Sequence, residues 1–262
     1  MIKYADMSLY KQAYELFDMI FDEDKVFNEY FFKNIFNINN LLVYMHNNRI
    51  IAMTQTIPYR INGIGELTYI YGAATHPKYR NNGLMSELLN KSFEMDKQKG
   101  FAGSILIPAN ESLFDFYAKF GYKKAFYKNT VTYKAVSDKI MPVSVDSFSK
   151  LNDIYEKASA NVAHTHRTKE YWQQQIRMFQ ELGGFVFCSE DTYAFGWINE
   201  NDKPKIQELI GDHKEILAGA VAYHFKTEEI KADTIGNETA MGVIKLYNNE
   251  QPQKMYMNLM YN

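Results

Sequence analysis

Apolar residues near the N-terminus recur at helical spacing and then give way to short β-rich runs. The first predicted helix follows a candidate N-cap at Asp6 or Ser8. Its inward face is formed by Leu9, Ala13, Leu16, Phe17 and Ile20. A second helix is predicted over residues 24–36. Residues 41–46 and 50–60 then read as two strands joined by His46-Asn47-Asn48-Arg49, a spacing typical of a β-hairpin.

The next stretch alternates between strand and helix patterns. A strand is predicted from Glu66 to Thr75, followed by a loop that ends at Gly83 and a helix over residues 84–99. A strand at 102–107, a short helix at 113–119 and two strands between residues 122 and 133 complete the N-terminal half. This order predicts a mixed sheet flanked by helices, in the α/β (α+β) class.

The pattern restarts after about residue 136, with the same types of element in a similar order but no matching residues. Helices are predicted at 147–158, 168–182 and 214–225, and strands at 185–188 and 192–199. Residues 243–247 and 255–261 are expected to close the chain as a pair of strands. The restart predicts a degenerate duplication, with one domain over residues 1–136 and a second over 137–262.

Composition excludes several classes of protein. The chain has 262 residues and a formal net charge of −2, so no basic face favours nucleic acid. The single Cys188 rules out an internal disulfide framework. The N-terminus lacks the apolar core of a signal peptide, and no apolar run approaches the ~20 residues that span a bilayer. These features predict a soluble, cytoplasmic protein with no nucleic-acid or membrane partner.

The loop between the predicted strand and helix carries candidate chemistry. The sequence runs from a strand through Arg80-Asn81-Asn82-Gly83 directly into the helix. The first turn of a helix has unpaired backbone N–H groups and the positive end of the helix dipole. Gly83 lets an anion approach the backbone closely, and Arg80 adds a positive charge. This arrangement predicts a cradle for a pyrophosphate group.

The loop admits two other interpretations. An ordinary strand-to-helix connection would also contain a glycine, so the loop alone does not decide between connection and site. Nucleotide binding is disfavoured, because the sequence has no Gly-x-x-x-x-Gly-Lys-Ser/Thr loop and Gly63-Ile64-Gly65 lacks the third glycine of a dinucleotide fingerprint. ATP and NAD are therefore poor candidates.

A second motif follows the first, and the two together are more specific than either alone. Ile107-Pro-Ala-Asn110 leads into a helix that contains Tyr117, shortly before Gly121-Tyr122. The pair of motifs resembles the GNAT superfamily of acyl-CoA N-acyltransferases, whose Arg/Gln-x-x-Gly-x-Gly/Ala loop is matched by Arg80-Asn81-Asn82-Gly83-Leu84-Met85. Met85 stands where that family often has glycine or alanine. The resemblance is specific over residues 41–134 and only topological afterwards.

The resemblance implies a role for each matching position. The backbone of Ala73, Ala74 and Thr75 would pair with the pantetheine arm of an acyl-CoA, and Asn110 would hydrogen-bond that arm. The backbone N–H groups of Arg80, Asn81, Asn82, Gly83, Leu84 and Met85 would hold the pyrophosphate. Tyr117 would protonate the leaving thiolate; packing beside neighbouring phenylalanines is the alternative reading of this residue.

The wider layout is similar to the two-domain Eis-type branch, in which a cofactor-free second copy follows the catalytic domain. Some members of that branch place the chain end in the site, so the terminal carboxylate of Asn262 is one candidate base for the amine. Glu66, on the predicted cofactor strand, is another. An exposed carboxylate at the start of a strand explains Glu66 equally well.

The sequence therefore predicts an N-acetyltransferase that moves an acetyl group from acetyl-CoA to a primary amine by direct attack on the thioester. The acceptor, a small molecule or a peptide, stays open, as does assembly into a homo-oligomer. The alternatives are an acyl-CoA sensor without turnover and a transferase with a longer acyl or an aminoacyl donor. No metal is expected, because His164-Thr-His166 lacks a nearby cysteine or carboxylate pair.

Overall fold

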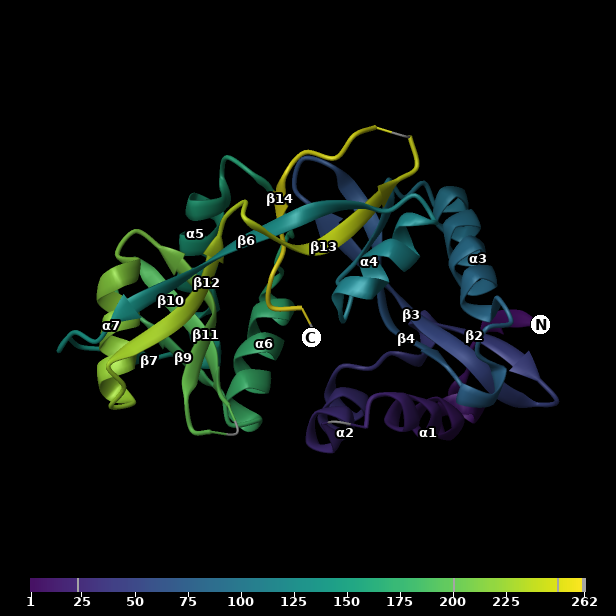
Figure 1. Cartoon of the computed structure of the whole chain (residues 1–262), viewed down its shortest axis with the longest axis horizontal. Coiled ribbons are helices and arrows are strands. Elements are labelled where there is room, and N and C mark those ends of the chain that lie inside the picture. Colours follow the sequence, from purple (N-terminus) through teal and green to yellow (C-terminus); the bar gives the residue numbers. More distant parts are fainter. Residues whose placement is uncertain (23, 200, 249, 261–262) are drawn as a thin grey trace. The chain divides into compact units, whose positions relative to one another are not determined.

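The computed structural model describes the chain except for residues 23, 200, 249 and 261–262 (Figure 1). Two compact units are present. Unit 1 comprises Met1–Lys123 and Val243–Pro252, and unit 2 comprises Lys124–Gly242 and Gln253–Asn262. This division differs from a single cut after residue 136, because strand β13 (Thr239–Leu246) pairs with a strand of unit 1 from Val243 onward.

Unit 1 is built on a sheet whose strands lie in the order β1-β2-β3-β4-β5-β13. The first four pair antiparallel, β4 and β5 pair in parallel, and β13 is antiparallel to β5. Asn47 and Asn48, both at positive φ, form the predicted hairpin turn between β2 and β3. The strands are β1 (Ile2–Tyr4), β2 (Leu41–His46), β3 (Arg49–Ile61), β4 (Gly65–Thr75) and β5 (Gly103–Leu106).

Helices cover both faces of this sheet. Phe17 of α1 (Tyr10–Ile20) and Phe31 of α2 (Lys25–Asn34) contact Tyr71 on one face of β4. Leu84 and Leu88 of α3 (Leu84–Gln98) pack against Leu42 and Ala52 on the opposite face. Short 3-10 turns lie at Met7–Leu9, Ile38–Asn40 and Pro77–Tyr79, and α4 (Glu111–Ala118) follows β5. Figure 1 shows α1 and α2 on the side of β3 and β4 away from α3.

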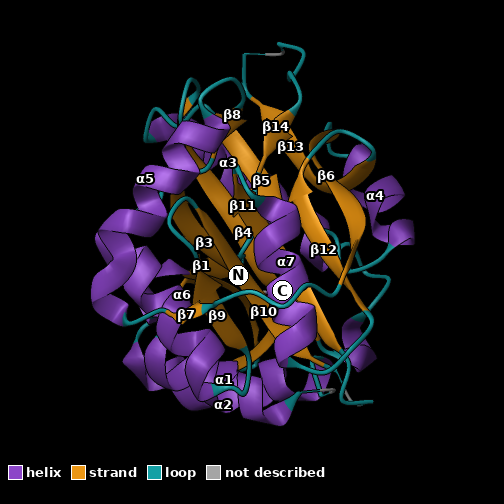
Figure 2. Ribbon diagram, turned by 90° about the vertical axis from the view of Figure 1, so that its left-hand side faces the viewer, coloured by secondary structure: helices purple, strands orange, loops and turns teal. Residues whose placement is uncertain are grey.

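In unit 2 the strands lie in the order β6-β12-β11-β10-β9-β7. Its helices are α5 (Phe148–Ser159), α6 (Lys169–Glu181) and α7 (Lys214–His224), and a 3-10 turn lies at Val145–Ser147. Helix α7 packs on β10, β11 and β12, in front of these strands in Figure 2. The strands are β6 (Lys123–Lys134), β7 (Met141–Pro142), β8 (Ala163–His164), β9 (Phe185–Cys188), β10 (Thr192–Ile198), β11 (Pro204–Gly211), β12 (Glu229–Ile235) and β14 (Met255–Tyr256).

The two units repeat one arrangement. In unit 1 the run β1-β2-β3-β4-β5 has three antiparallel pairings followed by a parallel one. In unit 2 the run β7-β9-β10-β11-β12 has the same sequence of pairings. In each unit, two helices precede the second strand of the run and one helix joins the parallel pair. The predicted α/β class is therefore confirmed, and the repeated order of pairings agrees with the predicted duplication.

Two predictions about strands were wrong. The region between residues 122 and 133 forms one long strand, β6, because it contains no glycine or proline and Asn129 is paired within the ladder. The expected pairing of residues 243–247 with 255–261 is also absent from the described residues, since β13 pairs with β5 and β14 pairs with β6 and β8. Alternation identified strand 243–247 but not its partner.

Candidate functional site

Strand β4 carries a bulge near its C-terminal end. The register with β3 changes from Gln55 opposite Tyr71 to Met53 opposite Ala74, so β4 holds one extra residue at Gly72–Ala73. Gly72 has a φ of 58°, and a Cβ there would lie 2.8 Å from the Phe17 ring. An isolated glycine within a predicted strand is a known signal for a bulge. The sequence reasoning did not use it.

Beyond the bulge, one edge of β4 is open. The pairing of β4 with β5 covers only Leu67–Tyr69, whereas pairing with β3 on the other side continues to Thr75. From Ile70 onward, no strand in the described part of the chain pairs with the β5 side of β4. The predicted positions Ala73, Ala74 and Thr75 lie in this stretch. An extended ligand can form backbone hydrogen bonds along such an edge.

The loop that follows β4 ends in a helix N-terminus with free donors. Gly83 is the N-cap of α3, with a φ of 75° and no side-chain cap. No hydrogen bond to another described residue is found for the backbone N–H groups from Asn81 through Ser86. These donors and the positive end of the α3 dipole together suit a phosphate group.

Side chains hold this loop in place and leave its backbone accessible. Arg80 Nε donates to the Thr75 carbonyl at 3.4 Å, and Asn82 Nδ2 donates to the carbonyls of Tyr79 and Arg80 at 3.1 and 3.2 Å. Residues 80–83 are exposed. Met85 packs with Leu84 against the apolar layer under α3, so its side chain is directed toward the sheet. The larger residue at this position is therefore accommodated.

Helix α4 begins at the same end of the sheet as α3, because β4 and β5 are parallel neighbours and each helix follows the C-terminal end of its strand. Asn110 is the N-cap of α4. Its Oδ1 accepts from the Leu113 N–H at 3.3 Å and from the Ser112 hydroxyl at 2.7 Å. The Asn110 amide nitrogen makes no hydrogen bond with another described residue. This group remains able to donate to a ligand carbonyl.

Tyr117 lies on α4 with its ring buried among aromatic neighbours. It makes edge-on contacts with Phe116 and Tyr122 at ring distances of 5.1 and 5.7 Å, and the Tyr122 hydroxyl hydrogen-bonds Ser104 of β5 at 2.7 Å. Within the described residues, the Tyr117 hydroxyl has no hydrogen-bond partner. Burial raises the pKa of Tyr117 to about 12, so the phenol is protonated at neutral pH and can act as a proton donor.

Of the two candidate bases, Glu66 is placed by the structure, and it lies away from this edge. Glu66 lies at the start of β4, opposite Arg60, with its carboxylate 3.6 Å from the Arg60 guanidinium and about half exposed. Seven residues of extended strand, or ~23 Å, separate it from Ala73. Asn262 lies outside the described residues.

Other reactive residues belong to unit 2. His164 Nε2 lies 3.1 Å from a carboxylate oxygen of Glu156, and His164 Nδ1 hydrogen-bonds the Val162 carbonyl. Cys188 is buried, which raises the pKa of its thiol. Among the described residues, no group of three or more metal-ligating side chains is assembled.

Sequence reasoning missed the contribution of the segment Val243–Pro252. Lys245 Nζ donates to the Phe120 carbonyl at 2.6 Å. The Tyr247 hydroxyl donates to the buried Asp96 carboxylate at 2.7 Å, and Thr68 of β4 donates to the same carboxylate at 2.6 Å. The contacts of Lys245 and Tyr247 link residues more than a hundred positions apart. A local pattern at residues 243–247 can indicate a strand but cannot identify such partners.

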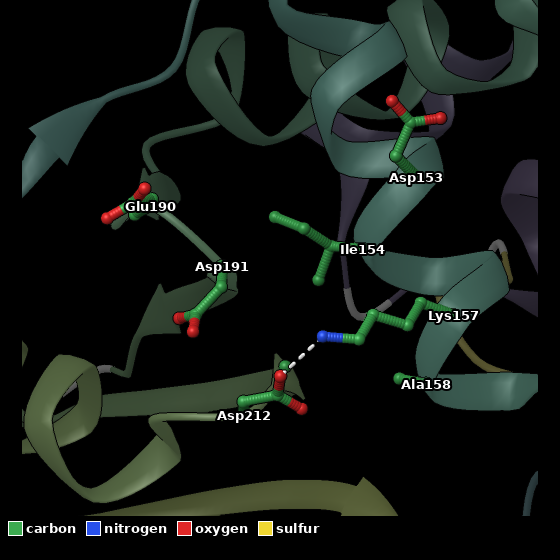
Figure 3. A pocket seen from close by; sticks show the side chains of 8 residues that line it. Asp153, Ile154, Lys157, Ala158, Glu190, Asp191 and Asp212 are labelled. Atoms are coloured by element: carbon green, nitrogen blue, oxygen red, sulfur yellow. Dashed lines mark hydrogen bonds and ion pairs between the residues drawn. The ribbon is translucent and has the colours of Figure 1, made fainter.

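The corresponding turn of unit 2 has a different character. Between β11 and α7 lie only Asp212 and His213. Beside this turn is a cavity of about 160 Å³ lined by Asp153, Ile154, Lys157, Ala158, Glu190, Asp191, Gly211 and Asp212 (Figure 3). The Lys157 ammonium lies 2.6 Å from the Asp212 carboxylate and is engaged with it. A surplus of carboxylates does not favour an anionic ligand.

Comparison with known proteins agrees with the geometry of unit 1. A family model described as an acetyltransferase (GNAT) domain matches residues 1–125. This match identifies residues 1–125 as a GNAT acetyltransferase domain. No curated protein matches the sequence. None of the described helices has the length and apolar character needed to cross a membrane.

Several solved structures share the fold of both units at low sequence identity. A conserved protein of unknown function from Enterococcus faecalis V583, described as a probable N-acyltransferase, has a TM-score of 0.74 at 15% identity, covering 94% of this chain and 72% of that one. Eis1 from Mycobacterium abscessus has a TM-score of 0.67 at 12% identity, covering 94% and 73%. A putative acetyltransferase from Pyrococcus horikoshii has a TM-score of 0.62 at 14% identity, covering 100% and 94%.

Proposed function

We propose that unit 1 binds acetyl-CoA and transfers its acetyl group to a primary amine. One observation carries the proposal: the open edge of β4 leads directly to a helix N-terminus with six successive N–H groups that have no partner among the described residues. An acyl-pantetheine arm fits the first feature and a pyrophosphate fits the second. Acetyl-CoA joins these two chemical groups in one molecule.

Each candidate residue takes a role that suits its surroundings. The backbone of Ala73, Ala74 and Thr75 pairs with the pantetheine amides, and the Asn110 amide donates to one of their carbonyls. The pyrophosphate accepts from the N–H groups of residues 81–85, near the Arg80 guanidinium. The Arg80 N–H was also expected to contribute, but it donates to the Pro77 carbonyl at 3.3 Å. These contacts hold the thioester in a fixed orientation, which lowers the entropic cost of attack by a second substrate.

Transfer requires one new bond, one broken bond and three proton movements. The amine nitrogen attacks the thioester carbonyl carbon, and the carbonyl oxygen gains negative charge that a backbone N–H near Ala73 can stabilise. The C–S bond then breaks, the amide remains, and Tyr117 gives its proton to the sulfur. The amine, whose pKa is ~10, must lose one proton before attack and a second as the amide forms.

The route of the amine proton is a separate hypothesis. Glu66 is not favoured as the base, because it is ion-paired with Arg60 and distant along the strand from Ala73. The terminal carboxylate of Asn262 is retained as the candidate. A Gly-Ser extension after Asn262 is expected to weaken amine acetylation and leave acetyl-CoA affinity unchanged. Full turnover by the extended chain would remove Asn262 from the mechanism.

The direct test combines binding and turnover. Calorimetric titration with acetyl-CoA is expected to give one site per chain, and a concentration of 100 times the dissociation constant should stabilise the fold by ~2.7 kcal/mol. A panel of amines, assayed by release of the CoA thiol, is expected to contain at least one acceptor. Two sites, or none, would contradict the assignment of binding to unit 1 alone.

The same assay separates the alternatives. An acyl-CoA sensor would bind acetyl-CoA and release no thiol with any amine. A transferase for longer acyl groups would bind longer acyl-CoA thioesters more tightly than acetyl-CoA. An enzyme with an aminoacyl donor would show neither competition by acyl-CoA nor thiol release.

A further inference from the structure

Lys245 reaches helix α4 from a distant part of the sequence. It lies on the portion of β13 that belongs to unit 1, directly opposite Ser104 of β5. Its Nζ donates to the Phe120 carbonyl at 2.6 Å across a sequence separation of 125 residues. The same ammonium lies 5.1 Å from the centre of the Phe93 ring, a distance that suits a cation–π contact. Lys245 is thus fixed on two sides.

The Phe120 carbonyl is part of the turn that ends α4. The last carbonyls of a helix have no partner within the helix and carry the negative end of its dipole, so a lysine ammonium is favourable there. In the same turn, the Tyr117 carbonyl accepts from the Phe120 N–H at 2.9 Å. The peptide groups of Phe120 therefore connect Lys245 to the backbone of Tyr117 through two hydrogen bonds.

Gly121 provides the space that this contact needs. It has a φ of 86°, and a Cβ at this position would lie 2.9 Å from Lys245 Nζ. Burial lowers the pKa of Lys245, and the Lys97 ammonium lowers it further. The fold therefore places an ammonium where the loss of solvation and the charge of Lys97 both disfavour it. The hydrogen bond to the Phe120 carbonyl and the contact with the Phe93 ring offset this unfavourable placement of the ammonium.

We propose that Lys245 is a positioning residue for Tyr117: it holds the Phe120 carbonyl and thereby fixes the final turn of α4 and the direction of the tyrosine hydroxyl. This inference rests on the proposed function, in which Tyr117 protonates the leaving sulfur. A proton donor that is displaced by ~1 Å can cost a large factor in rate. Ligand contacts at the β4 edge and at the N-terminus of α3 do not involve Lys245.

The test uses the full chain with Lys245→Met, which keeps an unbranched side chain against Phe93 and removes the donor to Phe120. The expected result is a roughly tenfold lower kcat with an acetyl-CoA dissociation constant that changes less than about threefold. Lys245→Arg keeps a cationic donor and is expected to recover most of the rate. Lys123→Met is the matched control. Lys123 is exposed, and among the described residues its ammonium donates only to the Gln251 side chain.

A double-mutant cycle distinguishes positioning from simple stabilisation. If Lys245 acts through the Tyr117 hydroxyl, Lys245→Met has little further effect on kcat in a Tyr117→Phe chain. An equal loss in both backgrounds, or an unchanged kcat in the single variant, would overturn the proposal. Lys245→Gln provides the same cycle, with the same two overturning results, if the methionine variant does not fold.

The outcomes also separate this inference from the proposed function. A wild-type chain that releases no thiol with any amine contradicts the proposed function itself. A wild-type chain that turns over, slows on Tyr117→Phe and is unaffected by Lys245→Met retains the function and loses the positioning role.

Discussion

Units 1 and 2 share one order of strands and differ most at the turn after their fourth strand. In unit 1, residues 76–83 separate β4 from α3 and leave a run of backbone N–H groups without described partners. In unit 2, Asp212 and His213 alone separate β11 from α7. The sheet is therefore compatible with either turn. Turn length decides whether the helix N-terminus can receive a phosphate.

Backbone packing and ion pairs surround the turn between β11 and α7 in unit 2. A Cβ on Gly211 would lie 2.2 Å from the Asp191 carbonyl, so this backbone already contacts the connection between β9 and β10. His213 Nδ1 pairs with the Asp191 carboxylate at 2.6 Å, and Lys157 pairs with Asp212. The Lys157 ammonium is thus engaged by a carboxylate, and the Lys214 ammonium donates to the Gly211 carbonyl at 2.8 Å.

Unit 2 also lacks the helix that carries the proposed acid. In unit 1, β5 is followed by α4 and Tyr117, whereas in unit 2, β12 is followed by a short turn and then β13. The repeated fold thus supplies a sheet with a parallel strand pair in both units. The chemistry of unit 1 depends on two additions, the long turn before α3 and the helix after β5.

The largest expected effect tests the second addition. Tyr117→Phe keeps the ring and its contacts with Phe116 and Tyr122 but removes the hydroxyl, so folding and acetyl-CoA affinity should change little. The kcat is expected to fall by roughly 10²–10⁴-fold, as is usual when a general acid is removed. Steady-state kinetics at saturating substrates, with a melting temperature for each chain, would measure this. An unchanged kcat would mean that the thiolate leaves without help from α4.

A somewhat smaller effect tests the first addition by giving unit 1 the acidic character of unit 2. Gly83→Asp is expected to weaken acetyl-CoA binding by roughly 10²-fold, because a carboxylate near the pyrophosphate costs about 1–4 kcal/mol per charge pair. Gly100→Asp is a close control. Gly100 lies at the other end of α3, has a φ of 74° against 75° for Gly83, and likewise has open space around its Cβ position. Equal losses of affinity in the two variants would show that strain, not charge, is responsible.

Local sequence patterns predicted the parts of unit 1 that depend on short-range physics. The Asn47–Asn48 turn and the α3 N-terminus at Gly83 both follow from residues close together in the chain. The duplication was also visible, because the order of patterns repeats even though the residues do not. Each of these features needs only a helical or strand period and a suitable residue at the boundary.

Long-range pairing could not be predicted in this way. Nothing in residues 243–247 indicates that Lys245 lies opposite Ser104, since alternation specifies a strand and its faces but not its neighbour. The open edge of β4 depends on where pairing with β5 stops, which is set by the bulge at Gly72 and the Phe17 ring against it. Glu66 was a candidate base because it belongs to β4, but it lies at the start of that strand, far from Ala73.

A third prediction concerns pH and again involves Tyr117. Because burial raises the pKa of Tyr117 to about 12, its protonated and active form persists through the whole range from pH 7 to 10. The amine acceptor, in contrast, gains its reactive form as pH rises toward a pKa of ~10. The kcat/KM for the amine is therefore expected to rise roughly tenfold between pH 8 and 9, with no falling limb below pH 10. A falling limb between pH 8 and 10 would indicate a different acid.

The smallest expected effect concerns the start of the fourth strand, where both units use ion pairs. In unit 1, Glu66 faces Arg60, and in unit 2, Lys205 lies 3.3 Å from Asp233. The Glu66–Arg60 pair is exposed, unlike the pair of the buried Asp233, and exposed pairs contribute about 0–1 kcal/mol to stability, so a structural role predicts little cost on removal. Glu66→Gln is accordingly expected to leave kcat and kcat/KM within about twofold of the wild-type values, as is Arg60→Gln. Removal of a true general base would instead lower kcat by roughly 10²–10⁴-fold and flatten its dependence on pH. That result, seen for Glu66→Gln and not for Arg60→Gln, would restore Glu66 as the acceptor of the amine proton and would require the amine to approach β4 from the end opposite Thr75.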